Sequence, residues 1–416
     1  MKPPPQPRLL SLLLLAATLS APAQEWTRFR GPNGSGISHA RTIPTVWTPK
    51  DITWRAELPG TGHSSPVVWG DRVLLMSGEE KSNRVSVLCL GTARGDLVWR
   101  RDFPVAPYHR NNFNTLASGS PAVDQDRVYT AWSDAERMVA RTFDHAGKLL
   151  WERDLGPFAS QHGGACSPVL WHDLVIISKE HDGESFITAL DAATGAPRWK
   201  APRHQTPTTY ATPFLYEPDA GPPALVFAGQ GHGFSALSPA DGTTLWELPG
   251  VFDKRVVGSP ILADGLLIAS CGSGEGGNYL VAARPGDTRQ GTHPAVAYKI
   301  TRSSPYVPTS VCAEGRLFLW ADDGTVSCLR PATGEVVWQQ RLGKHFFSSP
   351  VWVDGRVFCA STTGDVLVIR AGDRFELLAT NPLGETVHST PAVAGGRMFI
   401  HTTKHLVCVT SEPPAP

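Results

Sequence analysis

Short runs of alternating apolar and polar residues recur along the chain, and tight turns join them in pairs. In the stretch SSPVWVDGRVF (348–358), apolar residues follow the proline, and more apolar residues follow Asp-Gly. A period of two indicates β-strands, and Asp-Gly is typical of the turn between two antiparallel strands. The stretch therefore predicts a β-hairpin.

The same pattern occurs eight times. A proline marks seven of the copies, at residues 66, 121, 168, 213, 260, 350 and 391, and Ser310 takes the place of the proline in the sixth copy. The copies are 40 to 55 residues apart. Repeats of this length that contain strands are typical of propellers built from four-stranded blades.

A second motif lies out of phase with the first, as in ALDAATGAPRW (189–199). It predicts a strand, a turn that ends in glycine because the turn needs a positive φ, and a strand that carries tryptophan. Tyr298 takes the tryptophan's place in the fifth blade. We expect these side chains to pack between neighbouring blades, whereas a ligand stack, the alternative, would need them on the axis. The structural blade tryptophans are Trp54, Trp99, Trp151, Trp199, Trp246 and Trp338.

The last copy lacks its fourth strand, because the sequence ends soon after LVCVT (406–410). The stretch ITWRAELPG (52–60), which carries Trp54, precedes the first copy and is expected to complete the last blade. Pairing of the two ends then closes the ring and leaves no exposed sheet edge. The sequence thus predicts an all-β, eight-bladed β-propeller over 52–411, preceded by a leader coil (24–51) packed on the propeller and followed by a tail (412–416).

Residues 1–23 have the pattern of a secretory signal peptide. Lys2 and Arg8 are positively charged, LLSLLLLAATL (9–19) is apolar but short for a membrane span, and APA (21–23) fits a cleavage site. We expect an exported protein, periplasmic or secreted, with no transmembrane segment after cleavage. No cysteine lies near the predicted cut, so a lipoprotein is not expected.

Charge and cysteine content narrow the picture further. The 38 Lys and Arg balance the 38 Asp and Glu, so there is no electrostatic reason to expect nucleic acid as a partner. The seven cysteines form no CxxC pair. Cys89, Cys328 and Cys408 occupy matching positions in the repeat, and we expect buried free thiols that behave as small apolar residues.

The combination of ALDAATGAPRW-type motifs with SSPV-type motifs resembles the pyrroloquinoline-quinone (PQQ) repeat over about residues 52–410. That family includes quinoprotein alcohol dehydrogenases and the propeller lipoprotein of the outer-membrane barrel-assembly machinery. EWTRFRGPNGSG (25–36) is also similar to the leader of such exported propellers, with Trp26 or Phe29 as the expected anchor. The resemblance implies the fold, but a fold alone does not imply an activity.

Features of both functional groups are missing from this sequence. The dehydrogenases pack two adjacent cysteines on the quinone and use a calcium ion held by Glu and Asn with an Asp base, but this chain has no Cys-Cys pair and no positions matched to those residues. The anchoring cysteine of the barrel-assembly lipoprotein is also absent. No cofactor is therefore expected, and PQQ with calcium belongs only to the alternative function.

Histidines gather on one predicted face of the ring. Connections from a fourth strand to the next first strand lie on the same face as the turns between second and third strands, and ten of the fourteen histidines fall there. We predict that this face binds a ligand, favouring an anionic one when histidines are charged below about pH 6.5. The alternative is that polar loops simply tolerate histidine. The candidate ligand-binding residues are His63, His162, Arg255, His345 and His388.

The chain shows no HExxH, GxSxG or P-loop motif, so neither catalytic nor metal-binding residues are assigned. We therefore expect an exported, non-catalytic propeller that acts as a binding or scaffold module for a protein, peptide or polymer of the cell envelope. The alternative is a reduced, quinoprotein-like oxidoreductase that depends on PQQ.

Overall fold

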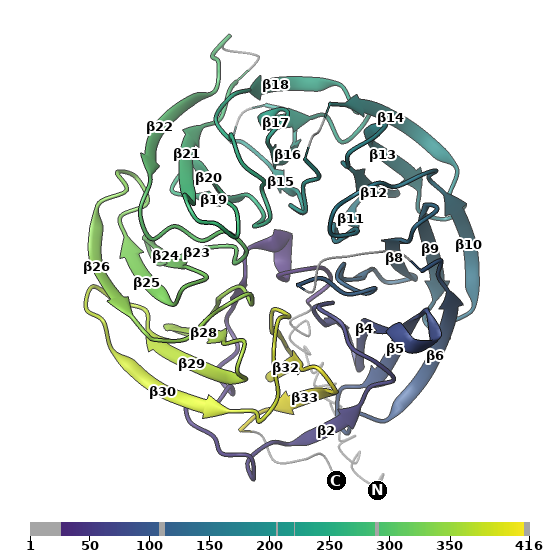
Figure 1. Ribbon diagram of the computed structural model, residues 1–416, viewed down its shortest axis with the longest axis horizontal. Coiled ribbons are helices and arrows are strands. Elements are labelled where there is room, and N and C mark those ends of the chain that lie inside the picture. The colour runs from purple at the N-terminus through teal and green to yellow at the C-terminus, as the bar shows by residue number, and fades with distance from the viewer. Residues whose placement is uncertain (1–25, 108–112, 205–206, 220, 288–290, 412–416) are drawn as a thin grey trace, which may run out of the picture.

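Eight sheets, seven of four strands and one of five, stand around a central axis in the computed structural model (Figure 1), which describes residues 26–107, 113–204, 207–219, 221–287 and 291–411. The first strand of each sheet lies nearest the axis and the fourth lies outermost (Figure 1). The prediction of an all-β, eight-bladed propeller is confirmed. Two 3-10 turns, η1 (Pro32–Gly34) and η2 (Glu80–Ser82), are the helical elements of the described residues.

Blades 1 to 4 follow one another along the chain. Blade 1 consists of β3 (Val67–Trp69), β4 (Arg72–Glu79), β5 (Arg84–Gly91) and β6 (Leu97–Pro104), and blade 2 of β7 (Ala122–Val123), β8 (Arg127–Ser133), β9 (Met138–Asp144) and β10 (Leu149–Asp154). Blade 3 consists of β11 (Val169–Trp171), β12 (Leu174–Lys179), β13 (Ser185–Asp191) and β14 (Pro197–Arg203), and blade 4 of β15 (Phe214–Tyr216), β16 (Ala224–Gly229), β17 (Gly233–Leu237) and β18 (Thr244–Leu248).

Blades 5 to 8 continue the ring. Blade 5 consists of β19 (Ile261–Ala263), β20 (Leu266–Cys271), β21 (Tyr279–Arg284) and β22 (Ala295–Ile300), and blade 6 of β23 (Val311–Ala313), β24 (Arg316–Trp320), β25 (Thr325–Leu329) and β26 (Val336–Arg341). Blade 7 consists of β27 (Val351–Val353), β28 (Arg356–Ala360), β29 (Asp365–Arg370) and β30 (Leu377–Pro382), with β1 (Ile37–Ser38) as a fifth strand. Blade 8 consists of β31 (Ala392–Ala394), β32 (Arg397–His401) and β33 (His405–Val409), with β2 (Trp54–Glu57) as its fourth strand.

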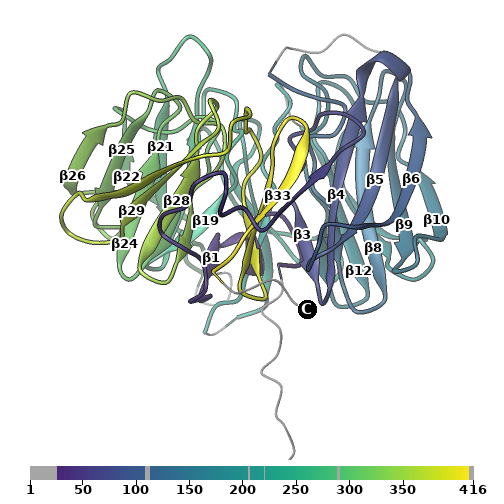
Figure 2. The same ribbon diagram turned by 90° about the horizontal axis from the view of Figure 1, so that it is seen from below.

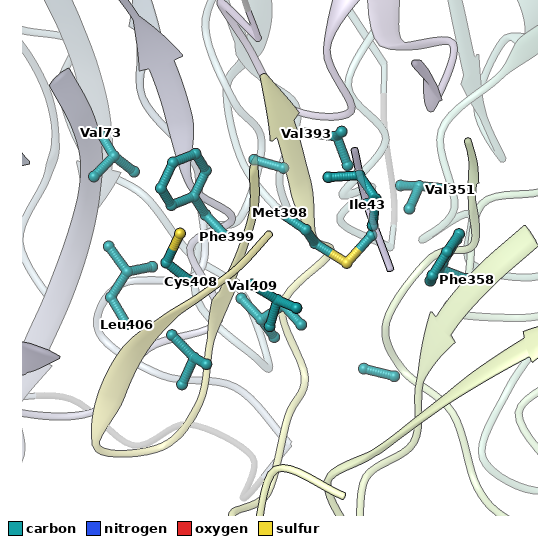
Figure 3. Close-up of a cluster of buried hydrophobic side chains, with 14 of the residues drawn as sticks. Ile43, Val73, Val351, Phe358, Val393, Met398, Phe399, Leu406, Cys408 and Val409 are labelled. Atoms are coloured by element: carbon teal, nitrogen blue, oxygen red, sulfur yellow. The ribbon is translucent and has the colours of Figure 1, made fainter. Parts of the chain in front are cut away.

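Blade 8 combines strands from the two ends of the propeller. β2 pairs antiparallel with β33, and Trp54 lies opposite Cys408. The predicted closure of the ring by N- and C-terminal strands is therefore confirmed. An apolar cluster that includes Ile43, Val73 and Phe399 fills the seam where blades 7, 8 and 1 meet the leader (Figure 3).

Each motif tryptophan lies between neighbouring blades. It packs on the turn between the third and fourth strands of the next blade. Trp54 covers Gly95, and a Cβ atom on that glycine would lie 2.5 Å from the indole ring. The same contact recurs for Trp99 with Gly147, Trp151 with Gly195, Trp199 with Gly242 and Tyr298 with Gly334, at 2.5–2.7 Å. Trp246 lies near Gly286, and Trp338 donates its indole N–H to the carbonyl of Gly372. At Gly95, Gly147, Gly195, Gly242 and Gly334, glycine is required both by the close approach of the ring and by the positive φ of the turn.

The seven cysteines are free thiols. Cys89, Cys328 and Cys408 are at most 1% exposed, so their predicted burial is confirmed. Burial raises the pKa of Cys89 and Cys408 to about 12 and that of Cys328 to about 11. These side chains therefore act as small apolar core residues.

A closed ring of eight hydrogen bonds, which we call the hydroxyl belt, surrounds the axis where the first strands begin. In each blade, the residue before the repeat's proline, or before Ser310 in blade 6, donates its backbone N–H to the hydroxyl of its counterpart in the next blade. The eight N···O distances lie between 2.8 and 3.2 Å. The order is Ser65, Ser120, Ser167, Thr212, Ser259, Thr309, Ser349, Thr390 and back to Ser65.

The leader crosses the axis on the face formed by the first-to-second-strand turns, where β1 lies in the side view (Figure 2). Trp26 bridges to Val68 of β3, the carbonyl of Thr27 accepts the N–H of Val123, and β1 pairs parallel with β27. Trp26 is thus a buried anchor, as expected for one of the two candidates. Phe29 is only half-buried, and the other deeply buried leader side chain is instead Arg30.

Arg30 joins the leader to the carbonyl groups beside the hydroxyl belt. Its guanidinium is fully buried, and all five of its N–H groups donate to backbone oxygens at 2.8–3.3 Å. The acceptors are Gly34 and Ser35 in the leader, and Thr309, Ser310 and Pro350 in blades 6 and 7. Burial lowers the pKa of Arg30 to about 9, but the five bonds leave no donor unsatisfied.

The hydroxyl belt can be tested at Ser120. Changing Ser120→Ala removes the acceptor of the Ser65 N–H and leaves that buried donor unpaired, which should lower the free energy of unfolding by about 1–3 kcal/mol in urea denaturation. Ser120→Thr should retain most of the stability, because threonine already occupies the belt at 212, 309 and 390. Wild-type stability of the alanine variant would contradict a structural role for the belt.

Candidate binding face

The predicted site residues lie on the face opposite the leader, which we call the loop face. It consists of the connections from fourth to first strands and the turns between second and third strands, at the top of the side view (Figure 2). Each connection ends at the hydroxyl belt. Residues that directly precede the belt are therefore held at matching places around the axis.

His63 and His388 occupy matching places in neighbouring blades, each two residues before its belt residue, and the structure brings them together. Nε2 of His63 and Nδ1 of His388 are 2.8 Å apart, and the rings meet edge-on at 4.5 Å. One nitrogen must donate and the other accept, so the pair holds a single shared proton between those atoms. The backbone N–H of His63 donates to the carbonyl of Ala117, which ties the pair to the connection between blades 1 and 2.

The predicted charging of this pair below about pH 6.5 is wrong. Burial lowers the pKa of His63 well below its usual value, and the nearby His388 and His401 lower it further. Burial also lowers the pKa of His388. The pair is therefore neutral at pH 6.5, and an anion would gain positive charge from it only at lower pH.

His401, at the end of β32, lies under this pair and was not assigned to the site from the sequence. Its Nδ1 donates to the carbonyl of Ser64 at 2.7 Å, while its Nε2 is buried and has no hydrogen-bond partner. The side chain is 1% exposed, and burial lowers its pKa to about 4. The ring is thus kept neutral because protonation would create a buried N–H without an acceptor.

His162 and Arg255 form a second pair. Nη1 of Arg255 donates to Nε2 of His162 at 3.0 Å, and Nη2 donates to the side-chain oxygen of Gln161 at 3.1 Å. His162 must be unprotonated at Nε2 to accept this bond. Its pKa is lowered first by burial and then by the arginine charge. The ring of Tyr210 lies 6.3 Å away and extends this group.

His345 is exposed and lies apart from both pairs, with Nδ1 3.2 Å from the carbonyl oxygen of Asp322. The carboxylate of Asp322 accepts the backbone N–H groups of Tyr306 and Val307 at 2.6 and 3.0 Å. Burial raises its pKa to about 6 in spite of these bonds. The five candidates therefore form two pairs and one separate histidine, and their role in binding stays a prediction.

An aromatic group connects the first pair to solvent. Phe347 lies 5.1 Å from the ring of His388, and Phe113 packs edge-on against Phe347 at 5.5 Å. Phe113 belongs to the connection between blades 1 and 2, yet it contacts blade 7, so this connection reaches across the loop face. Its side chain is 66% exposed.

No group of three or more His, Cys, Asp or Glu side chains is placed to hold a metal ion within the described residues. None of the helices among them has the length and apolar character that a membrane span requires. The predicted signal peptide, 1–23, and tail, 412–416, lie outside the described residues.

The repeats, the ring and its closure define a PQQ-like β-propeller, as the sequence predicted. Residues 83–304 and 299–375 match the family model described as outer membrane protein assembly factor BamB. Because the match extends over more than half of the chain, the chain belongs to this family. No curated protein sequence matches it significantly.

Solved structures with the same fold include enzymes and BamB. A europium-containing methanol dehydrogenase is 14% identical; the match covers 93% of this chain and 89% of that chain, with a TM-score of 0.67. BamB from Moraxella catarrhalis is 16% identical, with 87% of this chain and 98% of that chain covered and a TM-score of 0.61. The quinohemoprotein alcohol dehydrogenase from Comamonas testosteroni is 12% identical, with 94% of this chain and 81% of that chain covered and a TM-score of 0.65. At these identities the likeness shows the fold alone.

The buried His401 should make stability depend on pH. Its pKa is about 4 in the fold and returns to about 6.5 on unfolding, so its stabilisation is complete above pH 6.5 and is lost as the pH falls from 6.5 to 4. The loss corresponds to about 3 kcal/mol. Changing His401→Gln keeps a donor for Ser64 but removes the titration, and should flatten this part of the profile in urea unfolding.

The matched control is the exposed His293, changed to Gln. It should leave the pH dependence of the unfolding free energy as in the wild type, because its side chain is in solvent in both states. If His401→Gln also retained the wild-type slope between pH 6.5 and 4, burial of this imidazole would not be the cause of the pH dependence.

Proposed function

We propose that this protein is an exported, non-catalytic propeller that binds a protein, peptide or polymer of the cell envelope through its loop face. Export, to the periplasm or to the outside of the cell, is supported by the signal-peptide pattern of residues 1–23. The observation that carries the binding role is the group of Phe113, Phe347, His388 and His63, in which half-buried side chains support an exposed aromatic side chain.

The composition of the loop face suits recognition of a macromolecule. Aromatic residues and arginine contribute most of the binding energy in protein interfaces, in particular where neighbouring groups hold them in place. Phe113 is held by Phe347, and Arg255 is held by His162 and Gln161. Ordering these side chains on binding therefore requires little additional loss of conformational freedom.

The described residues of the loop face do not fit a calcium-bound PQQ. Calcium requires six to eight oxygen ligands, largely carboxylates and carbonyls. The carboxylate of Asp322 is already bonded to two backbone N–H groups, and no group of three or more His, Cys, Asp or Glu side chains among the described residues is placed to hold a metal ion. This donor set supports the binding module over the PQQ-dependent oxidoreductase.

Capture experiments with matched variants test the proposal. Phe113→Ser and the double change His63→Ala with His388→Ala should each weaken capture of envelope components by about tenfold, because they remove the exposed anchor or its support. Val46→Ser is the control, since Val46 lies in the leader and is also 66% exposed. Thermal melts establish that each variant is folded.

The purified wild-type protein should also show no dye-linked alcohol oxidation after incubation with PQQ and Ca²⁺. Turnover with PQQ would contradict the non-catalytic role. Equal capture by wild type and both loop-face variants would show that the partner binds elsewhere on the propeller.

A further inference from the structure

A cavity lies at the opposite end of the axis from the loop face, between the leader and blades 3 and 4. Its volume is about 240 Å³, and it is lined by Thr27, Arg28, Asn33, Leu170, Leu215 and Glu217. Leu170 belongs to β11 and Leu215 to β15, and Glu217 follows β15 directly, so the cavity opens on the leader's face. Its size suits a small molecule, because pockets for larger ligands are typically about 300–1,000 Å³.

Arg28 gives this cavity an unsatisfied positive charge. Its side chain is 92% buried, since 8% of its surface is exposed, and Nη2 donates to the carbonyl of Pro213. Its buried Nε has no hydrogen-bond partner. By contrast, all five donors of Arg30, two residues further on, are bonded to carbonyl groups.

Another buried arginine shows how this fold satisfies such a group when the role is structural. Nε of Arg203 donates to the carboxylate of Glu180 at 2.9 Å, and Nη2 donates to the hydroxyl of Ser235 at 2.8 Å. Arg28 has neither a carboxylate nor a hydroxyl partner of this kind. A carboxylate supplied by a ligand would form a charge-assisted bond to the guanidinium where Arg28 lines the cavity.

The other walls of the cavity define the rest of the ligand. Leu170 and Leu215 are apolar, and the exposed Glu217 adds a negative charge. Asn33 holds Leu215 in place through two bonds to its backbone, 2.6 Å from Nδ2 to the carbonyl and 2.8 Å from the N–H to Oδ1. The leader and β15 are thereby joined at the wall of the cavity.

We propose that this cavity binds a small molecule that carries a carboxylate, an ammonium group and an aliphatic side chain, the chemistry of an amino acid. Arg28 binds the carboxylate, Glu217 binds the ammonium group, and Leu170 and Leu215 contact the aliphatic part. This site lies on a different face from the proposed macromolecular interface, and either proposal can fail without the other.

Titration calorimetry of the full chain with three probes separates the contributions of the two charges. L-Leucine carries both groups, N-acetyl-L-leucine lacks the ammonium and mimics a peptide C-terminus, and isoamylamine lacks the carboxylate. We expect L-leucine to bind with a Kd of about 1 mM and the other two probes to bind at least about fivefold more weakly. No leucine binding at about 20 mM, or tighter binding of N-acetyl-L-leucine, would overturn the proposal.

Three variants identify the residues. Arg28→Met should weaken leucine binding by at least about tenfold, and Glu217→Gln should reduce leucine to the affinity of N-acetyl-L-leucine. Arg374→Met, at an exposed arginine of blade 7, should bind leucine as the wild type does. Wild-type affinity in either Arg28→Met or Glu217→Gln would overturn the assignment. Glu217 is on the surface, so its variant decides the question even if Arg28→Met does not fold.

Discussion

The whole centre of the molecule depends on the hydroxyl belt. Every first strand begins with a buried N–H whose acceptor belongs to the next blade, so no blade satisfies its own backbone alone. The belt is complete only when the eighth blade bonds back to the first. Because His63 and His388 each precede a belt residue by two positions, the belt also sets the geometry of the histidine pair on the loop face.

Most of the fold could be predicted because its signals are periodic. The repeated prolines established the blades, and Trp54 identified the strand that closes the ring. The belt was visible in the sequence as a Ser or Thr before each proline or before Ser310, yet its meaning was not, because seven of the partners lie 40 to 55 residues away and the eighth lies 325 residues away. A local pattern reveals which residue is required, but not the distant group that requires it.

The candidate site was less predictable, since it depends on loops and burial. His63 and His388 were both among the candidate residues, and they meet because they hold matching positions in neighbouring blades. The reach of Phe113 to Phe347 depends on the path of one long connection, and the neutrality of His401 depends on an environment that no sequence spacing describes. Arg28 and Arg30 were missed because arginine is rarely buried without a carboxylate partner.

Ring closure has a consequence for how the chain acquires its structure. β2 and the leader are synthesised first, but their partners in β33 and blades 6 and 7 are synthesised last. Such distant pairings form slowly, because closing a very long loop costs conformational entropy before any stabilising contact between its ends can form. The ring therefore closes, and Arg30 finds its partners in blades 6 and 7, only after the last blades have been synthesised.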